Sequence, residues 1–162
     1  MKIVHIVPGS GGTFYCQNCF RDLALVRALR KMGHDVMMVP LYLPMFVDDE
    51  GHAANAPVFF GGVNVWLQQK FGIFRKTPRW LDRLMDSNWL LRQAANQEGA
   101  TAASGLGPMT ISMLDGPSGR QAKELARLVD WMKTHERPDV VHISNALLLG
   151  LARPIKEALG VP

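Results

Sequence analysis

Hydrophobic residues in the first forty positions change from one spacing to another along the chain. Residues 3–7 and 36–39 form short apolar runs rich in Val, Ile and Met, which are typical of strands buried in a parallel sheet. Between these runs, apolar side chains recur at i, i+3, i+4 and i+7, as on one face of a helix. The sequence therefore predicts a strand, a helix that ends at Gly33, and a second parallel strand. The predicted stripe of this helix consists of Leu25, Ala28, Leu29 and Met32.

The same two spacings return in the last third of the chain. A helical stripe predicts a helix before residue 133, which Ser118 and Gln121 open as a capping box. A β-branched run at residues 140–143 predicts another parallel strand. Pro154 predicts a kink or a late restart in the last helix, and Gly160 its end. The stripe consists of Leu125, Leu128, Val129 and Met132.

Strands that alternate with helices indicate an α/β fold class. We expect a Rossmann-like, three-layer α/β/α domain around a mostly parallel sheet. A chain of 162 residues is long enough for one such domain with a hydrophobic core. Its hydrophobic content of 48% and charged content of 20% are typical of a globular protein.

A glycine-rich loop separates the first predicted strand from the first helix. Ser10, Gly11 and Gly12 follow Pro8 there, where free backbone N–H groups and the positive end of a helix favour anions. We therefore predict that this loop contacts a diphosphate. The spacing is not G-x-G-x-x-G, so a dinucleotide fingerprint is absent, and a plain tight turn is the alternative.

Polar residues follow two of the predicted strands. His142, Ser144 and Asn145 emerge at the end of the third strand and Tyr42 after the second, where ligands bind in open α/β sheets. They are cleft or acceptor-site candidates. The alternatives are a packed loop tyrosine, a strand histidine bonded to a neighbour, and helix caps at 144 and 145. No nucleophile elbow and no coherent set of Ser, His and Asp is present, and we predict no catalytic residue in this chain.

Two cysteines, Cys16 and Cys19, form a C-x-x-C at the front of the first helix. A helix N-terminus lowers a thiol pKa, so a redox pair of the thioredoxin kind is one interpretation. A zinc half-site is another, although no second C-x-x-C follows. The third is two small helix residues near a cleft.

Charge and hydropathy limit the partners of the chain. A formal net charge of +4 suits phosphate-bearing ligands without requiring nucleic acid. Residues 69–92 mix basic and aromatic side chains, which we interpret as an ordinary amphipathic helix with a solvated basic face; a peripheral contact with a membrane or an acidic acceptor is the alternative. No signal peptide or transmembrane stretch is visible. We expect a cytoplasmic protein, soluble or peripheral to a membrane, that binds no nucleic acid.

Two segments in the right order resemble one enzyme family. The first is the strand, the P-x-x-G-G loop, the helix and Gly33-His34-Asp35-Val36; the second is Arg137-Pro138-Asp139-Val140-Val141-His142 with the closing Gly160-Val161-Pro162. Together they cover about half of the chain and resemble the N-terminal domain of GT-B glycosyltransferases of family 4, the retaining, glycogen-synthase-like group.

The resemblance implies a single acceptor-side domain, residues 1–162, that precedes a donor-binding domain. The full enzyme would be a retaining hexosyltransferase that uses a UDP-, GDP- or ADP-sugar as donor and a sugar or lipid-linked acceptor. The loop at Ser10, Gly11 and Gly12 would contact the diphosphate. This chain would carry no cofactor and no metal, and alone it would be inactive. The acidic run at residues 48–50 is expected to be a solvated loop.

Two other functions fit the residues without the resemblance. One is a stand-alone module that binds a nucleotide or a sugar at the glycine loop. The other is a redox protein that uses Cys16 and Cys19.

Overall fold

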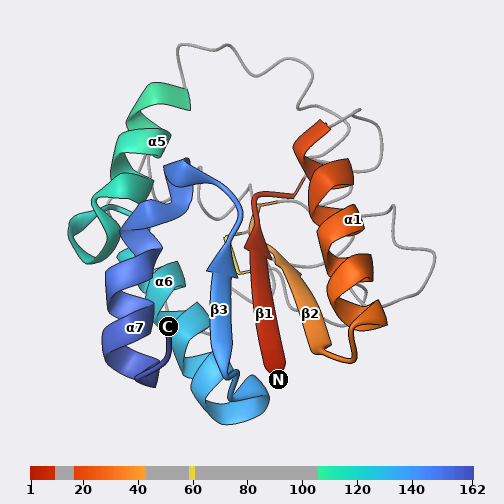
Figure 1. The fold of residues 1–162 in the computed structure, drawn as a ribbon. Helices are drawn as coiled ribbons and strands as arrows, with labels where there is room; N and C mark the ends of the chain where they lie inside the picture. The colour runs from red at the N-terminus through yellow and green to blue at the C-terminus, as the bar shows by residue number, and fades with distance from the viewer. Residues whose placement is uncertain (10–16, 43–58, 61–105) are drawn as a thin grey trace, which may run out of the picture.

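The fold is α/β, with an open, parallel three-stranded sheet accompanied by helices. The computed structural model describes residues 1–9, 17–42, 59–60 and 106–162. Strands β1 (Lys2–Val7), β2 (Asp35–Pro40) and β3 (Val140–Ile143) lie in the order β2-β1-β3. All three point the same way, so their carboxyl ends share the upper edge in Figure 1. The predicted α/β class and parallel strands are confirmed.

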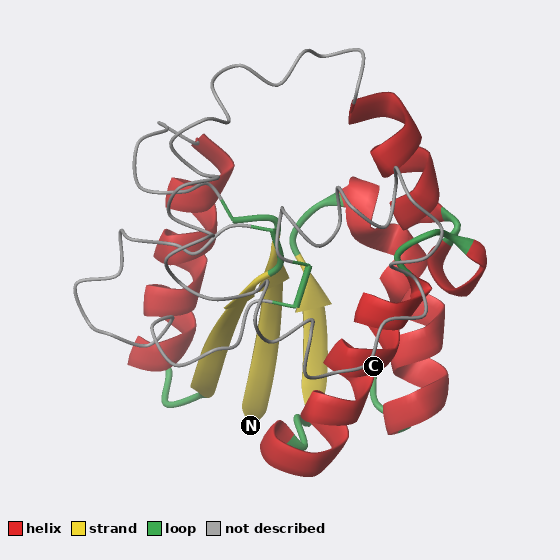
Figure 2. Ribbon diagram, turned by 180° about the vertical axis from the view of Figure 1, so that it is seen from behind, coloured by secondary structure: helices red, strands yellow, loops and turns green. Residues whose placement is uncertain are grey.

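The helical elements divide between the two sides of this sheet. α1 (Gln17–Lys31) lies beside β2, whereas α5, α6 and α7 lie beside β3, as the opposite views in Figures 1 and 2 show. Within the described ranges, no helix has the length and apolar character needed to cross a membrane. The later elements are α5 (Leu106–Leu114), η4 (Gly116–Ser118), α6 (Ala122–Trp131), the π-helical turn η5 (Met132–Glu136), η6 (Ala146–Leu151) and α7 (Ala152–Leu159).

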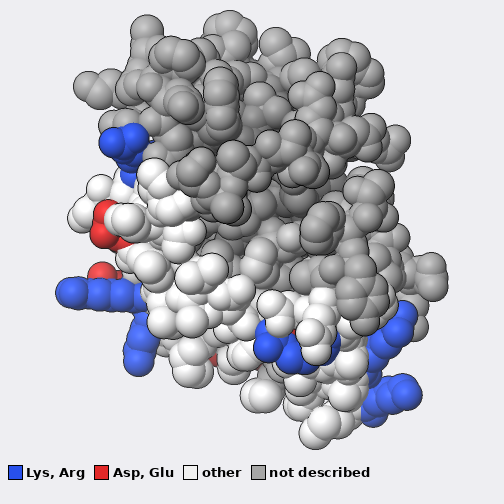
Figure 3. Space-filling view, turned by 90° about the horizontal axis from the view of Figure 1, so that it is seen from above, with Lys and Arg blue, Asp and Glu red and all other residues white. Residues whose placement is uncertain are grey.

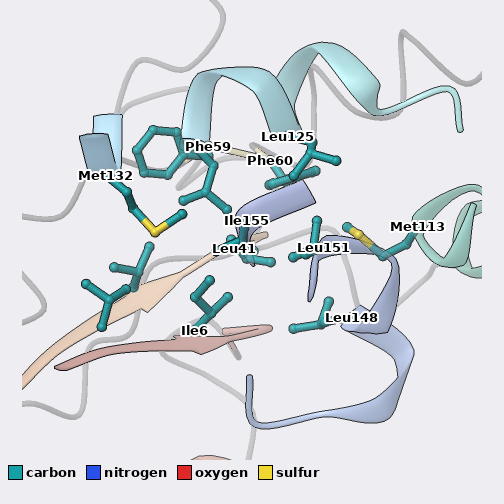
Figure 4. Close-up of a cluster of buried hydrophobic side chains, with 13 residues drawn as sticks. Ile6, Leu41, Phe59, Phe60, Met113, Leu125, Met132, Leu148, Leu151 and Ile155 are labelled. Carbon is teal, nitrogen blue, oxygen red and sulfur yellow. The ribbon is translucent and has the colours of Figure 1, made fainter. Parts of the chain in front are cut away.

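Alternation along β1 builds two separate cores. Ile3 and Val7 face α1, whereas Val4 and Ile6 face the other way, toward α6 and α7. Both faces of β1 are buried, which explains its nearly continuous apolar sequence. Figure 4 shows the larger core, which includes Ile6, Leu41, Phe59, Phe60, Met113, Leu125, Met132, Leu148, Leu151 and Ile155.

Helix α1 turns a different face to the sheet from the one predicted. Leu25 is exposed, and Met32 is 71% exposed. The buried face is offset around the helix and contains Cys19, Asp22, Leu23 and Val26, again at i, i+3, i+4 and i+7. Of the predicted stripe only Leu29 packs against this core, so the predicted face was wrong, and the charged Asp22 lies against the sheet.

The predicted helix ends agree with the structure, but one predicted cap does not. Gly33 and Gly160 both have positive φ, 86° and 70°, as C-terminal glycines require. The late restart at Pro154 is confirmed, because η6 gives way to α7 two residues before it. The capping box is wrong: Ser118 lies in η4, and Gln121 precedes α6 without a side-chain cap bond. The Gln121 side chain is buried instead.

Three glycines allow α5, η4 and η6 to meet backbone to backbone. A Cβ at Gly150 would lie 2.1 Å from the Met113 carbonyl oxygen, and one at Gly116 would lie 2.3 Å from the Gly150 oxygen. A Cβ at Gly119 would lie 1.9 Å from the Ser112 oxygen. This contact fixes η6, and hence the chain that leaves the end of β3.

We predict that Gly150→Ala lowers the free energy of unfolding by about 1–3 kcal/mol, because the new methyl group meets rigid backbone that cannot rotate away. Urea denaturation monitored by circular dichroism measures the effect. Gly107→Ala is the matched control, since a Cβ there has no neighbour within 4 Å. The control should be neutral or stabilising by up to about 1 kcal/mol. Equal stability of the two variants would contradict the close contact.

Candidate functional site

The order of the strands marks one edge of the sheet as the place for a site. The chain leaves β1 through α1 toward β2 on one side, while β3 pairs with β1 on the other side. Such a reversal is a topological switch point, outside which ligands bind in open α/β sheets. Gly9, with φ 84°, follows β1 there, and the Ser144 N–H donates to the Ile6 carbonyl at 3.0 Å. Lys and Arg side chains project from the margin of this face (Figure 3).

Two histidines are stacked below this edge. The parallel register sets His142 of β3 opposite His5 of β1, so both rings project from the α1 side of the sheet. Their ring centroids lie 4.7 Å apart with planes 8° from parallel, and the two Nδ1 atoms are 2.6 Å apart. His5 is 1% exposed, whereas His142 is exposed. The pair therefore joins a buried imidazole to the surface.

Asp22 brings a buried carboxylate to the inner histidine. It lies in α1, is 1% exposed, and its Oδ1 is 3.8 Å from His5 Nε2. Arg21 donates to the same oxygen from Nε at 3.2 Å and from Nη2 at 3.0 Å. Arg21 Nη2 also donates to the Ser144 carbonyl at 3.0 Å. The guanidinium thus joins α1 to the end of β3.

His5, His142, Arg21, Asp22 and Ser144 form one polar cluster, and some of its hydrogen-bonding groups have no partner among the residues that the structure describes. His5 Nε2, Asp22 Oδ2 and Ser144 Oγ are buried and make no hydrogen bond with the described residues. Buried polar atoms are nearly always partnered in folded proteins, by protein or by water. Three such atoms from β1, α1 and the end of β3 distinguish this cluster from an ordinary apolar core.

Burial sets the charge of the inner histidine. Burial and the neighbouring His142 together lower the pKa of His5 to about 4, although the Asp22 carboxylate acts in the opposite direction. Arg21 also disfavours a second positive charge at this point. His5 is therefore neutral at pH 7 and carries one ring proton.

The predicted cleft residues occupy different surroundings. His142 and Ser144 lie in or beside the histidine cluster, and Asn145 caps η6 by accepting a hydrogen bond from the Leu147 N–H at 2.9 Å. Tyr42 lies on the other side of the sheet, where its ring meets Phe60 edge-on. Its hydroxyl donates to Gln121 at 3.4 Å, and burial raises the pKa of the phenol.

The remaining candidates are only partly covered by the structure. Cys19 is buried in the core between α1 and the sheet. Cys16 and the loop at Ser10, Gly11 and Gly12 lie outside the described residues, as do the acidic run 48–50 and the basic segment 69–92.

Sequence reasoning missed the inner half of the cluster. His5 reads as a polar interruption in an apolar strand, and Arg21 and Asp22 read as surface residues of an amphipathic helix. One signal was present: Cys19, Leu23 and Val26 flank Asp22 at helical spacing, which puts the carboxylate on an apolar face.

Metal ligands and known relatives do not explain the cluster. In the part of the chain that the structure describes, no group of three or more His, Cys, Asp or Glu side chains is arranged to hold a metal ion. No family model, curated protein or solved structure matches the chain. The residues themselves therefore carry the functional argument.

We predict that the free energy of unfolding falls by about 3 kcal/mol between pH 6.5 and pH 4 through His5 alone. In this pH window His5 binds a proton in the unfolded chain but stays neutral in the folded chain. The free energy of unfolding therefore rises with pH and falls as the pH is lowered. His5→Phe should remove this part of the slope. Urea denaturation at several pH values measures it.

The control for this slope is His135→Gln, which removes an exposed histidine outside the cluster. It should keep the wild-type pH dependence. Parallel curves for His5→Phe and the wild-type protein would show that His5 titrates normally, against the prediction.

Proposed function

We propose that the chain is the acceptor-side domain of a retaining, sugar-nucleotide-dependent glycosyltransferase. In this proposal residues 1–162 form a Rossmann-like, three-layer domain, the N-terminal half of a GT-B enzyme of family 4. A donor-binding domain completes the enzyme, which works in the cytoplasm, free or at a membrane surface.

The observation that carries the proposal is the position of the two family-like segments at the switch point. The P-x-x-G-G loop begins at the carboxyl end of β1, and the segment that ends in His142 forms β3, directly beside β1. The segments are more than a hundred residues apart in sequence, yet the loop of the first begins, and the strand of the second ends, at the edge where open α/β sheets bind ligands.

The chemistry of this edge is consistent with sugar transfer. Backbone N–H groups of the loop at Ser10, Gly11 and Gly12, together with the N-terminus of α1, would stabilise the negative charge of the departing diphosphate. Polar side chains at the end of β3 would meet the acceptor, which is rich in hydroxyl groups. The donor would be a UDP-, GDP- or ADP-sugar held by the other domain.

We predict that residues 1–162 alone transfer no sugar. The reason is that the proposal assigns donor binding to another domain, so the reacting carbon is never held beside the acceptor. Incubation with UDP-, GDP- and ADP-sugars and an acceptor panel, followed by mass spectrometry, tests this. Robust transfer by the isolated chain would contradict the proposed division of labour.

A binding experiment tests the acceptor side directly. Methyl glycosides of glucose, mannose and galactose are titrated into ¹⁵N-labelled chain. A bound glycoside should shift the amide signals of Gly9, His142 and Ser144, and leave those of α7 unchanged. Shifts confined to other elements, or no binding by any glycoside or lipid-linked sugar, would count against an acceptor-side domain.

A further inference from the structure

We propose that Asp22, acting through His5, keeps His142 Nε2 free of a proton, so that this atom accepts a hydrogen bond from an uncharged hydroxyl group. The cluster then works as a directional relay in which Asp22 and His5 are positioning residues and His142 touches the ligand. The choice of a sugar hydroxyl rests on the proposed function; the proton positions do not.

The relay begins at the buried carboxylate. Neutral His5 has one ring proton, on Nε2 or on Nδ1. A proton on Nε2 faces Asp22 Oδ1 at 3.8 Å, whereas a proton on Nδ1 would turn the Nε2 lone pair toward the carboxylate. Two facing lone pairs in a buried site are costly, so the proton belongs on Nε2.

The second step transfers this constraint to the surface. With its proton on Nε2, His5 offers Nδ1 only as an acceptor. His142 Nδ1 lies 2.6 Å away, so it must be the donor. A neutral His142 then has a bare Nε2, which makes no hydrogen bond with the described residues.

Charge decides which ligand this nitrogen suits. A lone pair repels an anion, and the 60%-exposed Arg21 side chain, bonded to the neighbouring Ser144 carbonyl, disfavours a cation. The described residues also offer no metal-ligand group. An uncharged O–H or N–H donor remains, and of these the hydroxyl is the most abundant group of a sugar acceptor.

The first test reads the proton positions in the whole chain at neutral pH. Long-range ¹H–¹⁵N NMR of the imidazole rings should show His142 protonated on Nδ1 and bare on Nε2, and His5 the reverse. Asp22→Asn should weaken the preference for these proton positions, because the amide oxygen that accepts from Arg21 places less negative charge opposite His5 Nε2. Asp35→Asn, at an exposed aspartate that begins β2, should leave them unchanged. A proton on His142 Nε2 in the wild-type protein would overturn the relay, even if Asp22→Asn does not fold.

The second test uses the methyl glycosides as probes. His142→Gln and Asp22→Asn should each raise the Kd of a bound glycoside about three- to tenfold, the usual effect of one hydrogen bond, while Asp35→Asn leaves it unchanged. A glycoside that binds all four proteins equally would overturn the inference and leave the proposed function intact. If no glycoside binds, the proposed function and the hydroxyl assignment fail together, and the proton positions still decide the relay.

Discussion

The structure depends on the parallel register of β1 with both of its neighbours. Because β1 is the central strand, its alternation divides the apolar side chains into two cores and directs His5 to the face that α1 covers. The same register sets His142 opposite His5. A shift of β3 by one residue would turn His142 to the other face and leave His5 without its stacked partner.

Burying His5 and Asp22 has a cost that hydrophobic residues would avoid. Each is almost fully buried, and their nearest atoms are too far apart for a good hydrogen bond. Leu or Phe at position 5 would extend the apolar core instead. With His5 and Asp22 near the switch point, the fold has an imidazole whose proton is held on one nitrogen. An apolar core cannot supply such a group.

Much of the fold could be predicted from the sequence, because its determinants are local. Residues 36–39 read as a buried strand, the stripe on α6 is correct, and Gly33 and Gly160 end their helices. The orientation of α1 was not predictable in the same way. Two overlapping stripes satisfy the helical period, and the contacts of Cys19, Leu23 and Val26 with the sheet select the one that contains Asp22. The misread cap at Gln121 has a similar cause, since tertiary contacts with Tyr42 and Met109 engage its side chain.

The candidate site could be predicted from the sequence only in part, because its residues come from distant parts of the chain. His142, Ser144 and Asn145 could be placed at the edge of the sheet because they follow a strand in sequence. The surroundings of His142 and Ser144 depend on partners more than a hundred residues away, since His5 contacts the His142 ring and Arg21 donates to the Ser144 carbonyl. Arg21 and Asp22 are adjacent in α1, yet one binds the end of β3 and the other faces the middle of β1. A shift of α1 along the sheet would therefore change the position of Asp22 relative to His5 and, through the relay, the hydrogen-bonding character of His142. The helix that follows the glycine loop and the side chain proposed to meet the acceptor are in this way parts of one polar connection.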